Sequence, residues 1–260
     1  HFFRCLAVAQ YLKKKNKRVI FLIKYEKYIK KILRRSNINF INIHFNKSFK
    51  INSGILVVDL PIAKKTDVLI AQYKAKIIII DDFISNRYNC DHYISSNFKA
   101  SKFSFSYKKI FISPVYRLIN NLILSKNHVR KKTDKKNILI FLGGSDLHNF
   151  QLKLYNKICK ENLYKNYKFY FFIGPGVKKK LLYFKKKNIF FFNKYEKLRL
   201  IVQDTFCVIC NGGNAMFEML QLKIPCLAIP TSSQEKANVL FFKKKGIILQ
   251  FSFKKKLLSQ

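Results

Sequence analysis

The sequence is poor in glycine, proline and acidic residues, and it contains no tryptophan. Among 260 residues there are 8 Gly, 5 Pro and 13 Asp or Glu, against 52 Lys or Arg. So little Gly and Pro excludes a collagen-like chain, and no internal repeat of roughly 20 to 50 residues is present. Because 49% of the residues are hydrophobic, the chain can bury a full core, and its length predicts one large or two ordinary α/β domains.

The scarcity of acids leaves a formal net charge of +39. This charge is compatible with a nucleic acid, an anionic membrane surface or an acidic small substrate as partner. The lysines occur in short runs scattered between apolar blocks, whereas nucleic-acid-binding proteins concentrate charge on one face or tail. We therefore expect mostly solvated surface lysines and no nucleic-acid partner, and a basic nucleic-acid or membrane-surface binder without turnover is the least favoured function.

Long apolar runs and metal-binding patterns are also missing. No run approaches the roughly 18 to 20 residues of a membrane-spanning helix, so we expect a cytoplasmic protein. Cys207 and Cys210 form a C-x-x-C pattern, but it falls in a predicted strand, where residues three apart point to opposite faces. No second Cys or His pair completes a zinc set. We expect buried, reduced structural thiols, no metal and no cofactor.

Short β-branched blocks alternate with helix-length amphipathic segments along the whole chain. The blocks are almost continuously apolar, which is typical of strands covered on both faces, and the alternation predicts parallel sheets with right-handed crossovers. We expect strands at 18–23, 55–60, 76–82, 137–144, 169–174, 188–192, 205–210 and 225–230.

A polar, charged segment without apolar periodicity runs from Ser125 to Lys136. It predicts a linker at 125–136 between an N-terminal domain at 1–124 and a C-terminal domain at 137–260. The expected fold class is therefore α/β, with two Rossmann-like domains whose parallel sheets face a cleft.

Two Gly-Gly pairs lie where a predicted strand runs into a predicted helix. They are Gly143-Gly144 in "FLGGSDLHN" and Gly212-Gly213 in "VICNGGNAMFEML". Ligands of open parallel sheets bind at this junction, where glycine allows close approach and positive φ and the helix N-terminus offers free N–H donors. Together these features suit a phosphate or diphosphate. The alternative is a pair of ordinary tight turns.

Caps and one acid extend this interpretation. We expect Ser145 or Asp146 to cap a helix that begins near Leu147, and Asn214 to cap the helix after the second pair. Glu218 lies four residues after Asn214 on the same helical face, where its carboxylate could accept two hydrogen bonds from a ribose diol. An exposed surface acid is the alternative. Neither pair belongs to a P-loop or to G-x-G-x-x-G, which disfavours ATP hydrolysis and dinucleotide redox chemistry.

Two further strand ends carry weaker signals. Asp81 and Asp82 follow "KIIII", where a carboxylate could serve chemistry or cap the next turn. Gly174-Pro175-Gly176 also ends a strand, but because proline removes a backbone donor we interpret it as a turn.

An ordered set of motifs resembles a known family of nucleotide-sugar enzymes. The motifs are "HFFRCLAVAQYL" at 1–12, "VVD" at 57–59, "IIIDDFISNRYNCDHYISSN" at 78–97, "ILIFLGGSD" at 138–146 and "NGGNAMFEMLQLKIPCLAIPTSSQ" at 211–234. They are similar to motifs of the UDP-2,4-diacetamido-2,4,6-trideoxy-β-L-altropyranose hydrolases of pseudaminic acid biosynthesis and of related spore-coat polysaccharide proteins. The resemblance spans essentially the whole chain and implies the GT-B fold. It also implies a preceding strand and Gly-x-Gly loop, which are missing before His1.

The resemblance implies a UDP-sugar substrate whose anomeric carbon is attacked by water, with release of UDP. It places the catalytic base on His1, and an imidazole suits the task because it can accept the proton of a water molecule near neutral pH. A glycosyltransferase that uses the same nucleotide half and an acceptor is the alternative. The resemblance gives Gly143, Gly144 and Ser145 to the cleft-facing loop, Gly212, Gly213 and Asn214 to the diphosphate, Glu218 to the ribose, Asn211 and Gln234 to the rest of the nucleotide site, and Arg4, Asp59 and Asp82 to a sugar pocket.

The sequence departs from the family pattern near the expected sugar pocket. Pro61 stands where the family often has Tyr, Ser233 stands where it has Asn, and "INNLI" at 119–123 replaces Leu-Arg-Pro-Glu-Phe. The nucleotide end of the expected site is therefore better supported than the sugar end.

Overall fold

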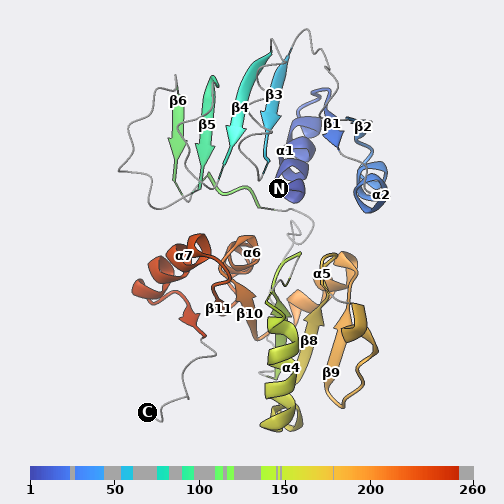
Figure 1. Ribbon diagram of the computed structural model, residues 1–260, viewed down its shortest axis with the longest axis vertical. Helices are drawn as coiled ribbons and strands as arrows, with labels where there is room; N and C mark the ends of the chain where they lie inside the picture. Colours follow the sequence, from blue (N-terminus) through green and yellow to red (C-terminus); the bar gives the residue numbers. More distant parts are fainter. Residues whose placement is uncertain are drawn as a thin grey trace. The chain divides into compact units, whose positions relative to one another are not determined.

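The computed structural model describes residues 1–23, 27–43, 54–60, 75–81, 90–96, 109–113, 116–119, 136–144, 146, 148–177 and 179–251. The chain divides into two compact units, residues 1–120 and 121–260 (Figure 1). Of the predicted linker at 125–136, only Lys136 lies within the described residues.

The first unit contains two parallel sheets. Its helices are α1 (Phe2–Lys14) and α2 (Lys27–Arg35), and its strands are β1 (Ile20–Ile23), β2 (Asn39–Asn42), β3 (Ile55–Val58), β4 (Lys76–Ile80), β5 (His92–Ser95) and β6 (Lys109–Ile112). The first two strands pair with each other, and the other four form a sheet in the order β3-β4-β5-β6.

Apolar residues of β3, β4 and β5 form the core of this first unit. The side chains of Val58, Ile79 and Tyr93 are buried together, and the Tyr93 hydroxyl donates to Asp81 Oδ2 at 3.0 Å. Because the strands are parallel, the residues that follow them, Asp59 after β3 and Asp81 after β4, lie at one edge of the sheet.

The second unit is a six-stranded parallel sheet with helices. The strands are β7 (Asn137–Phe141), β8 (Lys168–Phe172), β9 (Ile189–Phe192), β10 (Cys207–Asn211), β11 (Cys226–Ile229) and β12 (Leu249–Gln250). The helices are α4 (Phe150–Lys160), α5 (Tyr195–Gln203), α6 (Asn214–Gln221) and α7 (Ser233–Lys244), with the short 3-10 helices η3 (Leu163–Lys165) and η4 (Lys179–Tyr183).

The strand order β12-β11-β10-β7-β8-β9 is that of a Rossmann-like sheet. The chain starts at β7, proceeds outward to β9, and then returns to build β10, β11 and β12 on the other side of β7. The order therefore reverses between β7 and β10, and the carboxyl ends at such a switch point are where ligands bind in open α/β sheets. Both Gly-Gly pairs follow these two strands.

All eight predicted strands are present in shorter form, and the expected parallel sheets are confirmed. Four strands, β2, β5, β6 and β12, were not predicted. All six cysteines are free thiols, but only Cys210 and Cys226 are buried, so the expectation of buried thiols fails for the other four, which are half-buried. Among the described residues, no helix combines the length and the hydropathy that crossing a bilayer requires.

Candidate functional site

Three predicted site residues of the first unit lie in direct contact. His1 and Arg4 are one turn apart at the start of α1, and Asp59 follows β3, which lies beside α1 (Figure 1). Arg4 Nε donates to Asp59 Oδ2 at 2.9 Å and Arg4 Nη2 donates to Asp59 Oδ1 at 2.6 Å. His1 Nδ1 lies 2.5 Å from Asp59 Oδ1. The carboxylate is thus held by a bidentate guanidinium and an imidazole.

Burial and charge fix the protonation state of this cluster. The side chain of Asp59 is 0% exposed and that of Arg4 is 5% exposed. Burial alone would raise the pKa of Asp59, but hydrogen bonds from His1 and Arg4 and the charge of Arg4 outweigh it and lower the pKa. Asp59 is therefore a carboxylate at neutral pH.

The ionised carboxylate determines the role of each nitrogen of His1. Because a carboxylate only accepts hydrogen bonds, Nδ1 of His1 must donate to Asp59. Arg4 Nη2, which lies 3.0 Å from the same Nδ1, is then a close neighbour and not a hydrogen-bond donor to it. In the neutral imidazole Nε2 then carries the lone pair, and the side chain of His1 is 39% exposed, so a water or hydroxyl group can reach it. This is the arrangement of an oriented general base.

Cys5 borders this cluster without being a nucleophile. Its Sγ lies 3.9 Å from Asp59 Oδ2. Burial and the negative charge of Asp59 raise the pKa of the thiol to about 12. The thiol therefore stays protonated at neutral pH, which leaves His1 as the reactive side chain of the cluster.

The other predicted acids of this unit differ in status. Asp82 lies outside the described residues. Asp81 is buried and accepts a hydrogen bond from Tyr93. Ser96, which follows β5, accepts from Arg117 Nη1 at 2.9 Å, a contact that the sequence did not suggest.

In the second unit, the loops after β7 and β8 pack directly against each other. Gly143 has φ +81°, so the expected positive φ is present here. A Cβ on Gly174 would lie 2.5 Å from the carbonyl oxygen of Gly143, and Gly176 N donates to Gly144 O at 2.8 Å. Gly174, interpreted from the sequence as a turn residue, is therefore needed for close packing behind the Gly143-Gly144 loop. Ser145 lies outside the described residues.

The second Gly-Gly pair serves close packing and not positive φ. Gly213 has φ −94°, and Gly212 is not among the glycines with positive φ. A Cβ on Gly212 would lie 2.7 Å from both Glu235 O and Val239 Cγ2, and a Cβ on Gly213 would lie 2.7 Å from Glu235 Oε1. The expectation of a left-handed backbone was thus wrong here, because the glycines make room for the first turn of α7.

Glu235 is the residue that the sequence interpretation missed. Its carboxylate accepts from Asn211 Nδ2 at 2.8 Å, from Thr231 N at 2.8 Å and from Thr231 Oγ1 at 2.6 Å. These bonds tie the end of β10 to the loop that follows β11. The pattern Ser-x-x-Glu at 232–235, a capping box, could have identified it, and Ser232 Oγ does accept from Glu235 N at 3.2 Å.

The predicted cap of α6 and the predicted start of α4 need correction. Asn214 is the first residue of α6 and Gly213 is its N-cap, with no side-chain hydrogen bond to the helix end. The helix after the first pair begins at Phe150 instead of Leu147, because Asp146 accepts from the backbone N–H groups of Phe150 at 2.8 Å and Gln151 at 2.7 Å. Asp146 therefore caps that helix from outside it.

The remaining predicted nucleotide residues lie at the end of β10 and on α6 and α7. Glu218 is buried, so the alternative of an exposed surface acid is wrong. Gln234 lies in the first turn of α7, next to Glu235. The side chain of Asn211 lies close to three of the converging loops. Its Nδ2 donates to Glu235 Oε1. A Cβ placed on Gly143 would lie 3.5 Å from this nitrogen, and one placed on Gly213 would lie 3.3 Å from it. The Gly-Gly loops, Asn211 and α7 thus meet at the switch point.

No protein-family model matches the sequence. A curated relative, the uncharacterized protein MJ1062 of Methanocaldococcus jannaschii, is 24% identical in an alignment 254 residues long, and the match covers 88% of this chain and 52% of the relative. The chain therefore spans about half the length of the curated relative that it matches.

Solved structures resemble the chain over almost its entire length. MurG of Acinetobacter baumannii matches with a TM-score of 0.56 and 15% identity, covering 96% of this chain and 82% of MurG. The glycotransferase of kitacinnamycin matches with a TM-score of 0.60 and 10% identity, covering 96% of this chain and 83% of its own. UGT89C1 of Arabidopsis thaliana, complexed with UDP-L-rhamnose, matches with a TM-score of 0.58 and 9% identity, covering 95% of this chain and 80% of its own.

These structures are GT-B glycosyltransferases, and the expected fold class is confirmed. The chain has a GT-B-like α/β fold with parallel sheets. The specific resemblance to the altropyranose hydrolases stays a prediction.

Proposed function

We propose that the chain is an enzyme that cleaves the anomeric bond of a UDP-sugar, transferring the sugar to an acceptor hydroxyl. The observation that carries this proposal is the contact of His1 with the buried carboxylate of Asp59. Its support from the comparisons is that the similar structures include glycosyltransferases, one of them complexed with UDP-L-rhamnose.

In the proposed reaction His1 acts as the base. Nε2 takes the proton of the acceptor hydroxyl while its oxygen attacks the anomeric carbon. The bond from that carbon to the diphosphate oxygen breaks, and UDP leaves with the electron pair. Asp59 stabilises the imidazolium that forms, and Arg4 keeps Asp59 ionised.

The second unit would bind the nucleotide. We assign the diphosphate to the backbone N–H groups at Gly212–Asn214, where α6 begins without a side-chain cap. The ribose hydroxyls would bind Glu218, while Gly143-Gly144 and Gln234 would complete the nucleotide site. The carboxylate of Glu235 borders this proposed diphosphate site, since a Cβ on Gly213 would lie 2.7 Å from Glu235 Oε1.

Hydrolysis is the second candidate, and the order of the sequence motifs favours it. The same base would then take a proton from water, and the product would be a free sugar. Release of UDP from a panel of UDP-sugars, with and without candidate acceptor alcohols, separates the two. If the enzyme is a transferase, UDP release depends on the acceptor alcohol. If it is a hydrolase, UDP is released without any acceptor.

The base is tested by His1→Asn with Tyr11→Phe as the control. Tyr11 is exposed on the same helix, so its change should leave turnover and stability unaltered. We expect His1→Asn to lower kcat by about 10³-fold or more, with UDP affinity unchanged. Full turnover in His1→Asn would refute the assignment of the base, and failure of the wild type to bind UDP would refute the proposed function as a whole.

A further inference from the structure

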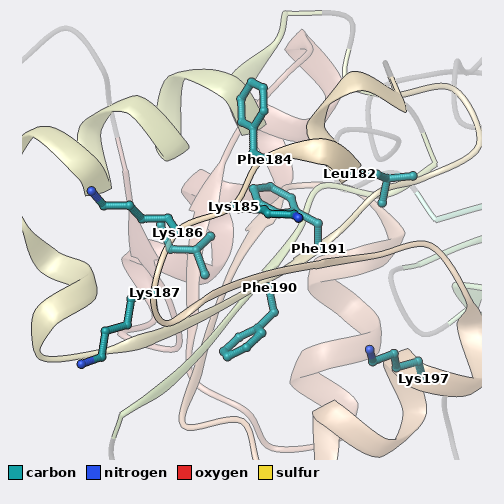
Figure 2. Close-up of a pocket in the computed structure, with 9 residues that line it drawn as sticks. Leu182, Phe184, Lys185, Lys186, Lys187, Phe190, Phe191 and Lys197 are labelled. Carbon is teal, nitrogen blue, oxygen red and sulfur yellow. The ribbon is translucent and has the colours of Figure 1, made fainter.

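A groove of about 540 Å³ lies on the second unit, away from the Gly-Gly loops. Its lining comes from η4, the residues that follow it, β9 and α5 (Figure 2): Leu182, Phe184, Lys185, Lys186, Lys187, Ile189, Phe190, Phe191 and Lys197. Lys185–Lys187 precede β9, so these lysines lie at the amino ends of the strands. The Gly-Gly loops follow the carboxyl ends of the parallel strands, so the groove is separate from the proposed nucleotide site.

An aromatic side chain of the groove lining is in contact with solvent, because Phe190 of β9 is 45% exposed. Figure 2 shows Phe184, Phe190 and Phe191 between Lys186 and Lys187 on one side and Lys197 on the other. Phe184 and Phe191 pack against the core, whereas Phe190, which leaves β9 on the opposite face from Phe191, is the exposed ring. The groove therefore combines one exposed aromatic ring with flanking lysines.

The three consecutive lysines are held by a fixed turn. Ile189 N donates to Lys186 O at 3.1 Å, and Asn188 adopts φ +60° within the turn. Asn188 Nδ2 donates to Tyr164 O at 2.9 Å, and Lys186 Nζ lies 4.6 Å from the centre of the Tyr164 ring. The turn thus fixes the backbone that carries the three lysines, and the Tyr164 ring holds the ammonium of Lys186.

The charges around the groove are all of one sign. No acid belongs to the described lining, and Glu196, the one acid of α5, does not line it. Lysine suits a lipid surface, because its apolar stem can lie along buried hydrocarbon while the ammonium stays at the headgroups. Arginine, the usual residue for recognising nucleic acid, does not line the groove.

We propose that this face docks the protein on an anionic lipid bilayer. Phe190 enters the headgroup region, and Lys185, Lys186, Lys187 and Lys197 bind the lipid phosphates. This docking does not depend on the proposed UDP-sugar reaction, since the groove shares no residue with that site.

The test is co-sedimentation of the full chain with vesicles of phosphatidylcholine alone or mixed with an equal part of phosphatidylglycerol. Changing Lys185, Lys186 and Lys187 to Gln should weaken binding to the mixed vesicles by about 100-fold. The matched control changes Lys243, Lys244 and Lys245 of α7 and its C-cap to Gln, with the same loss of charge. It should weaken binding far less. Phe190→Ala should weaken binding by about tenfold at any salt concentration.

Several results would overturn the docking surface. Equal losses in the two lysine variants would show an unspecific effect of net charge. Unchanged binding of Phe190→Ala would remove the apolar contact. Tighter binding to single-stranded RNA than to mixed vesicles, lost in the Lys185–Lys187 variant, would assign the face to nucleic acid. Circular dichroism and thermal unfolding establish that each variant is folded, so that a loss of binding reports on the surface.

Discussion

At the scale of single residues, Asp59 serves both the stability of the fold and the orientation of the proposed base. Its carboxylate satisfies the buried guanidinium of Arg4 and orients His1. Breaking a buried ion pair on one side costs about 3 to 5 kcal/mol, since it leaves an uncompensated charge. Asp59 therefore cannot be assigned to catalysis from an activity measurement alone.

The lowered pKa of Asp59 predicts a pH dependence of stability. Because the folded pKa lies below the ordinary value of 3.8, the folded state favours the ionised form, and this contribution is fully present above the ordinary value. It is lost as the pH falls below 3.8 and through the folded pKa, where the unfolded chain binds the proton first. Urea unfolding at neutral pH and in this acid range should show that the wild type loses more stability than Asp59→Asn. Parallel pH profiles would contradict the prediction.

Gly174 offers a sharper test of packing at a single residue. A Cβ there would lie 2.5 Å from Gly143 O and 2.7 Å from Gly144 O, which are backbone atoms and cannot rotate away. We expect Gly174→Ala to lower the free energy of unfolding by about 2 kcal/mol. Gly144→Ala is the matched control, because a Cβ on Gly144 meets nothing within 4 Å. Equal losses in urea unfolding would show that close packing is not the reason for glycine at 174.

At the scale of elements, Glu235 in the first turn of α7 affects how strongly the proposed site at Gly212–Asn214 can bind a diphosphate. Glu235 occupies the hydrogen-bond donors of Thr231 and Asn211 and touches Gly213. A carboxylate this close to a diphosphate would repel it, so nucleotide binding should be opposed by the side chain that orders the loops.

Glu235→Gln should therefore tighten UDP binding. The amide keeps an oxygen to accept from Thr231 but removes the negative charge. Once the Asn211 amide turns over, the new N–H can donate to Asn211 Oδ1, which is buried without a hydrogen-bond partner in the described part of the chain. We expect the Kd for UDP to fall about tenfold in isothermal titration. Glu235→Ala, which also removes the acceptor, should lower the melting temperature more than Glu235→Gln does. Weaker UDP binding by Glu235→Gln would show that the carboxylate supports the proposed diphosphate site.

At the scale of the whole molecule, continuous apolar runs made the architecture predictable. "KIIII" and "NILIF" became β4 and β7 because strands covered on both faces need side chains that are apolar throughout. β2, which reads "NFIN", and the two-residue β12 are partly exposed and carry no such signal. Their pairing depends on neighbouring strands and not on local composition.

The candidate site was predictable to the extent that it follows strand ends and ordered motifs. His1, Arg4 and Asp59 were named from the motifs and lie in contact. Glu235 and Gly174 were missed, because their roles come from packing between loops that are far apart in the sequence. Close packing against α7 also explains why residues 212 and 213 are glycines. The assignment of the nucleotide to this loop is therefore tested separately.

Hydrogen exchange of the full chain with and without UDP provides that test. The proposal assigns nucleotide binding to the second unit, and a ligand at 100 times its Kd stabilises the binding state by about 2.7 kcal/mol. UDP should therefore slow exchange in peptides covering β10, α6 and the start of α7, whereas peptides of β3, β4 and β5 should be unchanged. Glu218→Ala should abolish the protection, and Glu196→Ala, which removes an exposed acid of α5, should retain it. Protection confined to the first unit would place the nucleotide at the His1–Asp59 cluster and overturn the assignment to the Gly-Gly loops.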